Sequence, residues 1–178
     1  MCDKNLKDPI YGYITVDEGI IHDVVDSPCF QRLRNIVQTS YAPLYSAAVH
    51  NRFIHSLGVY HLGKIAYRAV SRSILQNENM TVPRNLDRYG QIFLLACLLH
   101  DVGHAPFSHT GEEYYLNLKE KGNKRYTELH NMLVEAVGNK QFRADVKSGE
   151  MGFEPAKPHE IMSTIVALKQ FPMLFKND

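Results

Sequence analysis

The sequence predicts an all-α fold with a short β-strand or hairpin near its N-terminal end. Several segments repeat apolar residues at helical spacing and carry start or stop signals, whereas only residues 11–16 alternate weakly in the manner of a strand. The 178 residues are 44% hydrophobic and 22% charged, an ordinary globular balance. Because this length can bury one sizeable core, we expect a single domain over residues 1–178.

The first helical segments are expected between residues 18 and 37. Apolar pairs at four-residue spacing predict a helix over 18–26. Ser27 and Pro28 then supply an N-cap and a first-turn proline for a second helix. The residues that this second helix should turn inward are Phe30, Leu33, Ile36 and Val37.

A long helix is expected from about Asn51 into 71–76, followed by a buried helix that Asn85 can cap. The inward stripe of the long helix should comprise Ile54, Leu57, His61 and Ile65. Residues 92–99 are apolar on every face, which is typical of a central helix. Gly103 and Pro106 disfavour further helix, so His100 and Asp101 should occupy the last turn, with His104 and His109 on the exit loop.

The remaining chain predicts three more helices and one loop. Two helices are expected near 112–119 and 128–137, the second capped by Thr127 and stopped by Gly138. Residues 140–158 are expected to form a loop. A last helix should begin around Pro158 and end before Pro172.

Composition excludes several classes of function. Lys and Arg total 20 against 19 Asp and Glu, so the net charge of +1 gives no support for broad binding of nucleic acid or anionic membrane. The three cysteines are odd in number and lack C-x-x-C spacing, which disfavours a disulfide framework or a thiolate zinc site. No apolar run is long enough to span a bilayer. We therefore expect a cytoplasmic protein without a membrane partner.

One segment places polar groups where they are costly. The apolar run over 92–99 delivers His100 and Asp101 to a buried helix end, and a divalent metal ion would satisfy both side chains. His55, beside the stripe of the long helix, offers a further ligand, and Arg52 one turn earlier can meet a phosphate. A lone histidine near an apolar face is more often a core residue, and it is the combination that favours a metal site.

The neighbouring residues have simpler interpretations that stay open. His104 and His109 can merely cap carbonyls of the ending helix. Arg32 and Arg34 are most simply a solvated face.

The motifs around these residues resemble those of HD-domain phosphohydrolases, and specifically the deoxynucleoside triphosphate (dNTP) triphosphohydrolase branch. The matching segments are H-N-R-F-x-H-S-L-G at 50–58, L-L-H-D-x-G-H-x-P-F-S-H at 98–109, D-P-I-Y-G at 8–12, F-Q-R-L-R at 30–34 and P-H-E at 158–160. The resemblance implies the helical HD fold. It also implies that the chain is the N-terminal part of a longer enzyme.

The resemblance assigns roles to nine residues. It implies that His55, His100 and Asp101 bind one divalent metal ion, which can be Mn, Fe, Ni, Zn or Mg. Arg52 would bind substrate phosphate, and Gln38 would lie near the sugar. The residues expected over the triphosphate are His104, His109 and His159, one of which protonates the leaving oxygen; His159 or His104 is favoured. Glu112 stands where relatives tend to have Asp beside the catalytic histidines.

The implied reaction is attack of water on the α-phosphorus of a dNTP, which releases the deoxynucleoside and intact triphosphate. The alternatives are hydrolysis of another nucleotide, such as a monophosphate, cyclic nucleotide or alarmone, and a non-catalytic nucleotide-sensing module. The family's fourth metal ligand is an Asp further along the chain than the segment resembling His159; here only Asp145 and Asp178 are candidates. We also expect a homo-oligomer, because relatives are commonly oligomeric.

Overall fold

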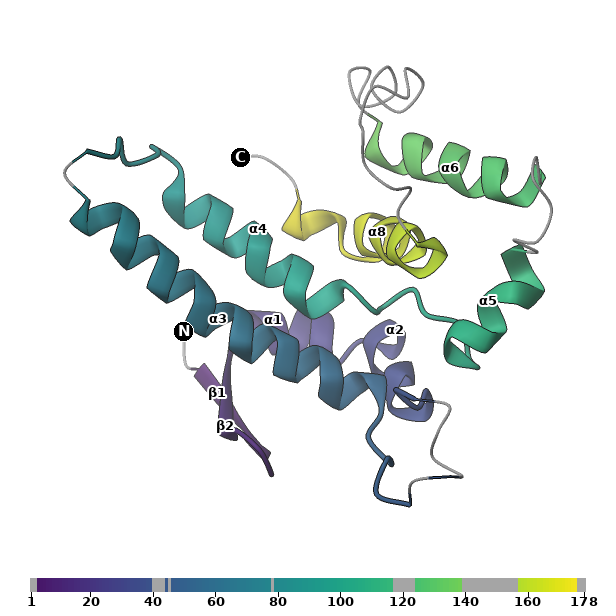
Figure 1. The fold of residues 1–178 in the computed structure, drawn as a ribbon. Helices are drawn as coiled ribbons and strands as arrows, with labels where there is room; N and C mark the ends of the chain where they lie inside the picture. The colour runs from purple at the N-terminus through teal and green to yellow at the C-terminus, as the bar shows by residue number, and fades with distance from the viewer. Residues whose placement is uncertain are drawn as a thin grey trace.

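The computed structural model describes residues 3–39, 44, 46–77, 79–116, 124–138 and 157–175. Helices dominate these residues, and one two-stranded antiparallel sheet precedes them (Figure 1). The predicted fold class is therefore confirmed. Among the described residues, no helix combines the length and the apolar character needed to cross a bilayer.

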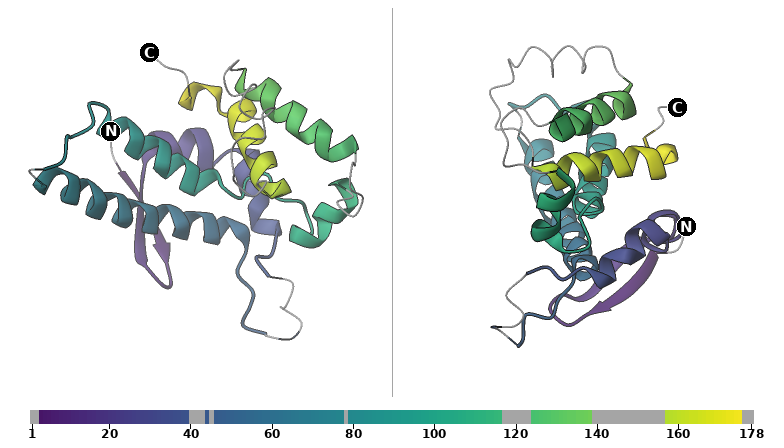
Figure 2. Two further views of the ribbon diagram at one scale, coloured as in Figure 1. Left: turned by 45° about the horizontal axis from the view of Figure 1, so that its top comes forward. Right: turned by 90° about the vertical axis from the view of Figure 1, so that its right-hand side faces the viewer.

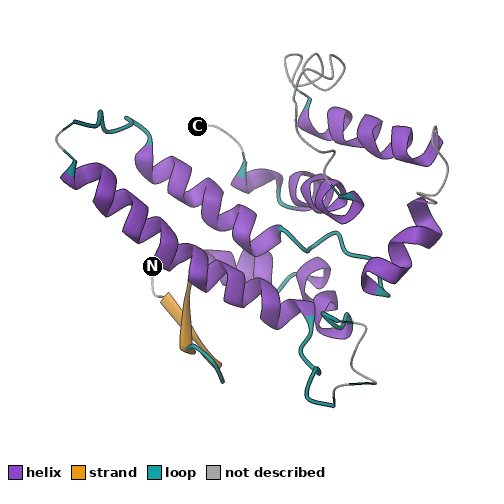
Figure 3. Cartoon of the chain, in the orientation of Figure 1, coloured by secondary structure: helices purple, strands orange, loops and turns teal. Residues whose placement is uncertain are grey.

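The chain begins with a β-hairpin, the orange strands of Figure 3. Strand β1 (Asp3–Asp8) pairs with β2 (Gly12–Asp17) in a register that runs from Asp3 opposite Asp17 to Asp8 opposite Gly12. The Asp8 carboxylate accepts hydrogen bonds from the amides of residues 10 and 11, at 2.8 and 2.9 Å, and Gly12 takes φ +76° to close the turn. The strand predicted over 11–16 is confirmed.

Short helical segments follow the hairpin. They are α1 (Glu18–Ile20), the π-helical turn η1 (Ile21–Val25), α2 (Pro28–Gln31) and the 3₁₀ turn η2 (Arg32–Asn35). Ser27 caps α2 as predicted, since its side chain accepts from the amide of Phe30. The prediction for Val37 was wrong: it is 47% exposed, because the helix has already ended and Val37 forms a bridge with Asn51.

Helices α3 (Arg52–Gln76) and α4 (Leu86–Leu99) lie side by side and run in opposite directions in the views of Figures 1 and 2. Asn51 caps α3 by accepting from the amide of Ile54 at 3.1 Å. The predicted inward stripe of α3 was partly wrong, because Leu57 is buried but Ile54 and Ile65 are 40% and 53% exposed. The face that α3 buries runs instead through Phe53, Leu57 and Tyr60.

Helix α4 is only partly buried, contrary to the sequence prediction of a central helix. Leu98 and Leu99 are buried in the core, together with the hairpin residues Ile14 and Val16. Ile92 is 45% exposed, because α4 packs against α3 and α8 and leaves its remaining face uncovered by other described residues.

The last elements are α5 (Ser108–Leu116), α6 (Lys124–Val137), α8 (Pro158–Gln170) and the 3₁₀ turn η3 (Pro172–Leu174). The α8 prediction is confirmed, and Gly138 ends α6 with φ +66°. The predicted cap Thr127 lies inside α6, so that boundary was wrong. Helix α8 packs against α6 through a small cluster of Leu129, Ile161 and Ile165. Residues 140–156 of the predicted loop lie outside the described residues.

Candidate functional site

The site is built on the turn that follows α4. Helix α4 ends at Leu99, so His100 and Asp101 follow its last residue directly. The guanidinium of Arg32, from η2, donates to the carbonyls of Val102 and His104 at 2.8 and 2.7 Å. These two bonds fix the path of the backbone between Asp101 and His104 and thereby set the directions of both side chains.

Helix α8 is held against the other side of this turn. The Gly103 amide donates to the Ser163 hydroxyl at 2.9 Å. A Cβ at Gly103 would lie only 2.3 Å from the backbone nitrogen of Ser163, so only glycine permits this approach. The close contact brings the first turn of α8, which carries His159, toward the turn after α4.

Three predicted residues converge where α3 meets the end of α4. The Nε2 atoms of His55 and His100 are 3.2 Å apart. The Asp101 carboxylate lies beside both, with Oδ2 3.7 Å from His55 Nε2 and Oδ1 3.4 Å from His100 Nε2. All three ligand atoms fall within 4.8 Å of one another.

We call this group the HHD cluster (His55, His100 and Asp101), and a local contact orients its His100 ring. The Nδ1–H of His100 donates to the Cys97 carbonyl at 2.9 Å, so its Nε2 carries the lone pair that faces the cluster. The donor set fits a divalent ion, because two imidazole nitrogens and one carboxylate point at a shared space.

Arg52 is buried beside the HHD cluster. Its side chain is 2% exposed, and its guanidinium donates to Asp101 Oδ2 and to the Ser108 hydroxyl. Ser108 adopts φ +54°, a left-handed conformation that is rare outside glycine, at the first residue of α5. The guanidinium therefore holds the Asp101 carboxylate in place, and the phosphate contact expected of Arg52 stays a prediction.

Electrostatics favour the metal-competent protonation states of the HHD cluster. Burial lowers the pKa of His55, and this outweighs the opposing effect of the Asp101 charge. Burial acts to raise the pKa of Asp101. The net effect is nevertheless a pKa below the ordinary value, because the positive charges of His100, Arg52 and His104 and the hydrogen bond from Arg52 stabilise the ionised carboxylate. A neutral imidazole and an ionised carboxylate are the forms that bind metal.

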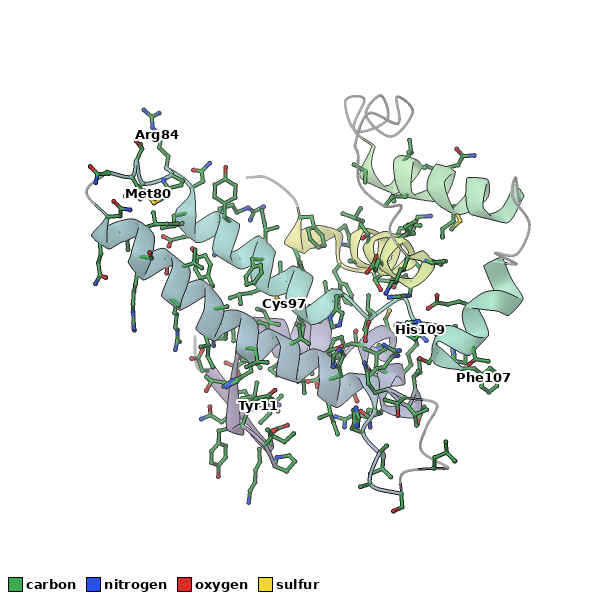
Figure 4. All side chains as sticks on the ribbon, viewed as in Figure 1. Tyr11, Met80, Arg84, Cys97, Phe107 and His109 are labelled. Atoms are coloured by element: carbon green, nitrogen blue, oxygen red, sulfur yellow. The ribbon has the colours of Figure 1, made fainter. Side chains whose placement is uncertain are left out.

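A second group gathers where the turn, α5 and α8 meet, and we call it the Glu112 cluster (His104, His109, Glu112 and His159). Glu112 Oε1 lies 2.9 Å from His159 Nδ1 and 3.3 Å from both His104 Nδ1 and His109 Nδ1. The rings of His104 and His159 stack with centroids 4.2 Å apart. Figure 4 shows His109 beside α8, while Phe107 points away from it and is 74% exposed.

His104 is the most buried of these histidines, at 1% exposed. Burial, reinforced by the positive charge of Arg52, lowers its pKa to about 3. Burial also lowers the pKa of His159. His109 differs from both, because its side chain is 61% exposed.

The structure brings together eight of the nine predicted site residues. The ninth, Gln38, directly follows Val37, which forms a bridge with Asn51 before α3. Its backbone amide donates to the His50 carbonyl, and no hydrogen bond or ion pair among the described residues joins it to either cluster. His109 was expected on a loop but lies in the first turn of α5. Sequence reasoning missed Arg32, which was interpreted as a solvated residue; its place in the F-Q-R-L-R motif was the available signal.

Comparisons with known proteins bear on this arrangement. The HD domain family model matches residues 52–150, more than half of the chain. An uncharacterised protein of Mycoplasma genitalium is 37% identical over 139 residues, which cover 76% of this chain and 30% of that protein. The deoxynucleoside triphosphate triphosphohydrolase SAMHD1 of Danio rerio is 37% identical over 141 residues, covering 76% of this chain and 22% of that protein.

A solved structure agrees with these matches. The crystal structure of a phosphohydrolase from Bacteroides thetaiotaomicron aligns with a TM-score of 0.50 and 25% identity, covering 96% of this chain and 36% of that one. The chain thus spans about a third or less of the length of the curated relatives described above. The family model, the relatives and the fold agree with the motifs, and the chain belongs to the HD-domain family.

Proposed function

We propose that this chain carries the metal centre of a phosphohydrolase that converts dNTPs to deoxynucleosides and triphosphate. One observation carries the proposal: His55 of α3 and His100 and Asp101 of the turn after α4 present their ligand atoms within 4.8 Å of one another. The similarity to a protein named as a dNTP triphosphohydrolase supports the substrate class. The expected homo-oligomer and cytoplasmic location stay predictions.

The HHD cluster would hold one divalent ion, and its mixed nitrogen and oxygen donors suit Mn, Fe, Ni, Zn or Mg. When bound, such an ion polarises a phosphate oxygen and lowers the pKa of water. Arg52 positions the Asp101 carboxylate through its hydrogen bond and keeps it ionised. Arg52 thus prepares the site before any substrate arrives.

We propose that the phosphate groups of a nucleotide held at the HHD cluster extend toward the Glu112 cluster. The two clusters adjoin, since His104 Nε2 is 3.5 Å from Asp101 Oδ1. We propose that His159 or His109 protonates the leaving oxygen. His104 is a poorer acid, because a ring with a pKa of about 3 holds no proton to donate near neutral pH.

The experiment is a product analysis. The protein is incubated with Mn²⁺ and dGTP, and the phosphate products are separated by ion chromatography. We expect tripolyphosphate and deoxyguanosine from the wild type, and a loss of at least about 100-fold in His100→Ala. His22→Ala, whose side chain is 87% exposed, is the matched control and should retain activity. Release of only pyrophosphate or inorganic phosphate would rule out the triphosphohydrolase reaction.

A substrate panel separates the alternative substrates within the same family. A nucleoside monophosphate, a cyclic nucleotide and an alarmone are tested beside dGTP under the same conditions. Faster turnover of one of these would reassign the substrate and leave the metal centre in place. Saturable binding of all nucleotides without any product would favour a sensing module instead.

A further inference from the structure

The backbone of Ser108 differs from that of every other described residue with a side chain beyond hydrogen. Among the described residues, positive φ values occur at Gly12 (+76°), Gly138 (+66°) and Ser108 (+54°). The left-handed region is strained for a residue with a Cβ, whereas glycine enters it without that strain. The backbone alone therefore favours glycine at position 108, and strain of this kind typically persists where function requires it.

The Ser108 side chain makes a contact that glycine cannot make. Ser108 is 7% exposed, and its hydroxyl oxygen accepts a hydrogen bond from Nη2 of Arg52. At the other end of the same guanidinium, Nη1 donates to Asp101 Oδ2. The Arg52 Nε is buried and has no hydrogen-bond partner among the described residues. Two bonds therefore hold the guanidinium, one to Ser108 and one to Asp101.

The bond to Ser108 fixes the plane of the guanidinium. This group is flat and rigid, so two acceptors at separate nitrogens define its orientation, whereas one acceptor leaves it free to turn together with that acceptor. The acceptor that would remain without Ser108 is the Asp101 carboxylate. Its two oxygens lie 3.7 Å from His55 Nε2 and 3.4 Å from His100 Nε2, so a turn of the carboxylate would change the arrangement of the HHD cluster.

We propose that Ser108 is a positioning residue for the metal centre. Its hydroxyl, presented by a strained backbone, orients Arg52 and through Arg52 the Asp101 carboxylate. This inference rests on the metal centre of the proposed function and adds a residue from α5 to its support. It has a specific consequence, because the backbone strain lowers the stability of the fold while the hydroxyl raises the affinity for metal. The two effects can be separated by substitution.

Three substitutions of Ser108 separate the hydroxyl from the strain. Ser108→Gly removes both, Ser108→Ala removes the hydroxyl but keeps the strain, and Ser108→Thr keeps both. The dissociation constant for Mn²⁺ is measured by titration calorimetry on the whole protein. The urea midpoint of unfolding is measured separately in the presence of chelator. Ser73→Ala, at an exposed serine of α3, is the matched control.

We expect the affinities and the stabilities to follow different orders. Ser108→Gly and Ser108→Ala should bind Mn²⁺ roughly 10-fold more weakly than the wild type, and to the same extent, because both lack the hydroxyl. Ser108→Thr should bind with nearly the wild-type affinity. The urea midpoint of Ser108→Gly should nevertheless be higher than those of Ser108→Ala and Ser108→Thr, because glycine relieves the strain. Ser73→Ala should match the wild type in both measurements.

A merely structural role of Ser108 would make affinity follow stability. Wild-type affinity in both Ser108→Gly and Ser108→Ala, or a loss that is larger in the less stable of the two, would overturn the proposal. The glycine and alanine variants decide the question even if Ser108→Thr does not fold. The expected pattern without release of tripolyphosphate from dGTP by the wild type would support the role of Ser108 and reject the proposed function. A wild type that binds no Mn²⁺ would reject both.

Discussion

Arg52→Met offers a direct measure of how the fold holds the proposed metal ligand Asp101. The side chains of Arg52 and Asp101 are 2% and 4% exposed, so the substitution leaves a buried carboxylate without its cationic partner. Breaking a buried pair in this way typically costs about 3–5 kcal/mol of the free energy of unfolding. For a chain of this length that corresponds to roughly 6–20 °C in the melting temperature.

The assay is urea unfolding at pH 7 in the presence of chelator, followed by circular dichroism. Arg72→Met, an exposed residue on the same helix α3, is the matched control and should unfold like the wild type. The pKa of Asp101 is lowered in the folded state, so the stability it contributes is present above the unfolded pKa of about 3.9 and is lost as the pH falls through the folded pKa. An Arg52→Met variant within 1 kcal/mol of the wild type at pH 7 would refute this reasoning.

Three further predictions follow from the same turn. The pKa of His104 is about 3 in the folded state and about 6.5 in the unfolded state, so acid favours the unfolded chain. When the pH falls from 7 to 5, the free energy of unfolding of His104→Gln should therefore decrease by about 2 kcal/mol less than that of the wild type. Equal decreases in urea titrations would disprove this. Gly103→Ala forces a Cβ into the backbone of α8 and should cost about 1–3 kcal/mol in unfolding free energy, whereas Gly58→Ala, which meets only a tyrosine side chain, should unfold with nearly the wild-type midpoint; similar midpoints for the two would contradict the clash. Arg32→Met frees the two carbonyls of the turn and should weaken Mn²⁺ binding roughly 10-fold by calorimetry, relative to Arg72→Met; an unchanged dissociation constant would mean that Arg32 does not support the metal site.

Local signals predicted the starts of α2 and α3, because capping is a local interaction, but they placed the starts of α5 and α6 about one turn too late. Ser27 and Asn51 each accept a hydrogen bond from the amide three residues later, and both helix starts were identified. The buried faces were harder to predict. Ile54 and Ile65 share a stripe with Leu57, yet the face that α3 buries depends on where α4 and the hairpin pack, which periodicity along one helix does not contain.

The same limit applied to the site. His100 and Asp101 were candidates because an apolar run carries them to a helix end, and His55 was a further candidate beside the apolar stripe of α3. Only the motif resemblance assigned all three residues to one ion. The close approach of His109 to Glu112 was not predicted, because the helix was expected to begin near residue 112. Helix α5 begins at Ser108, in a left-handed conformation that the sequence did not signal, and this start places His109 and Glu112 one turn apart on a helix.

The hydrogen bond from His100 Nδ1 to the Cys97 carbonyl stays within three residues of one chain segment. The rotamer and tautomer of His100 can therefore be selected as soon as α4 forms, before α3 docks against it. A ligand that is already oriented loses little side-chain entropy when an ion arrives, so more of the intrinsic coordination energy is retained as affinity. Replacing His100 with a longer, freely rotating donor would forfeit that advantage even if its tip reached the same place.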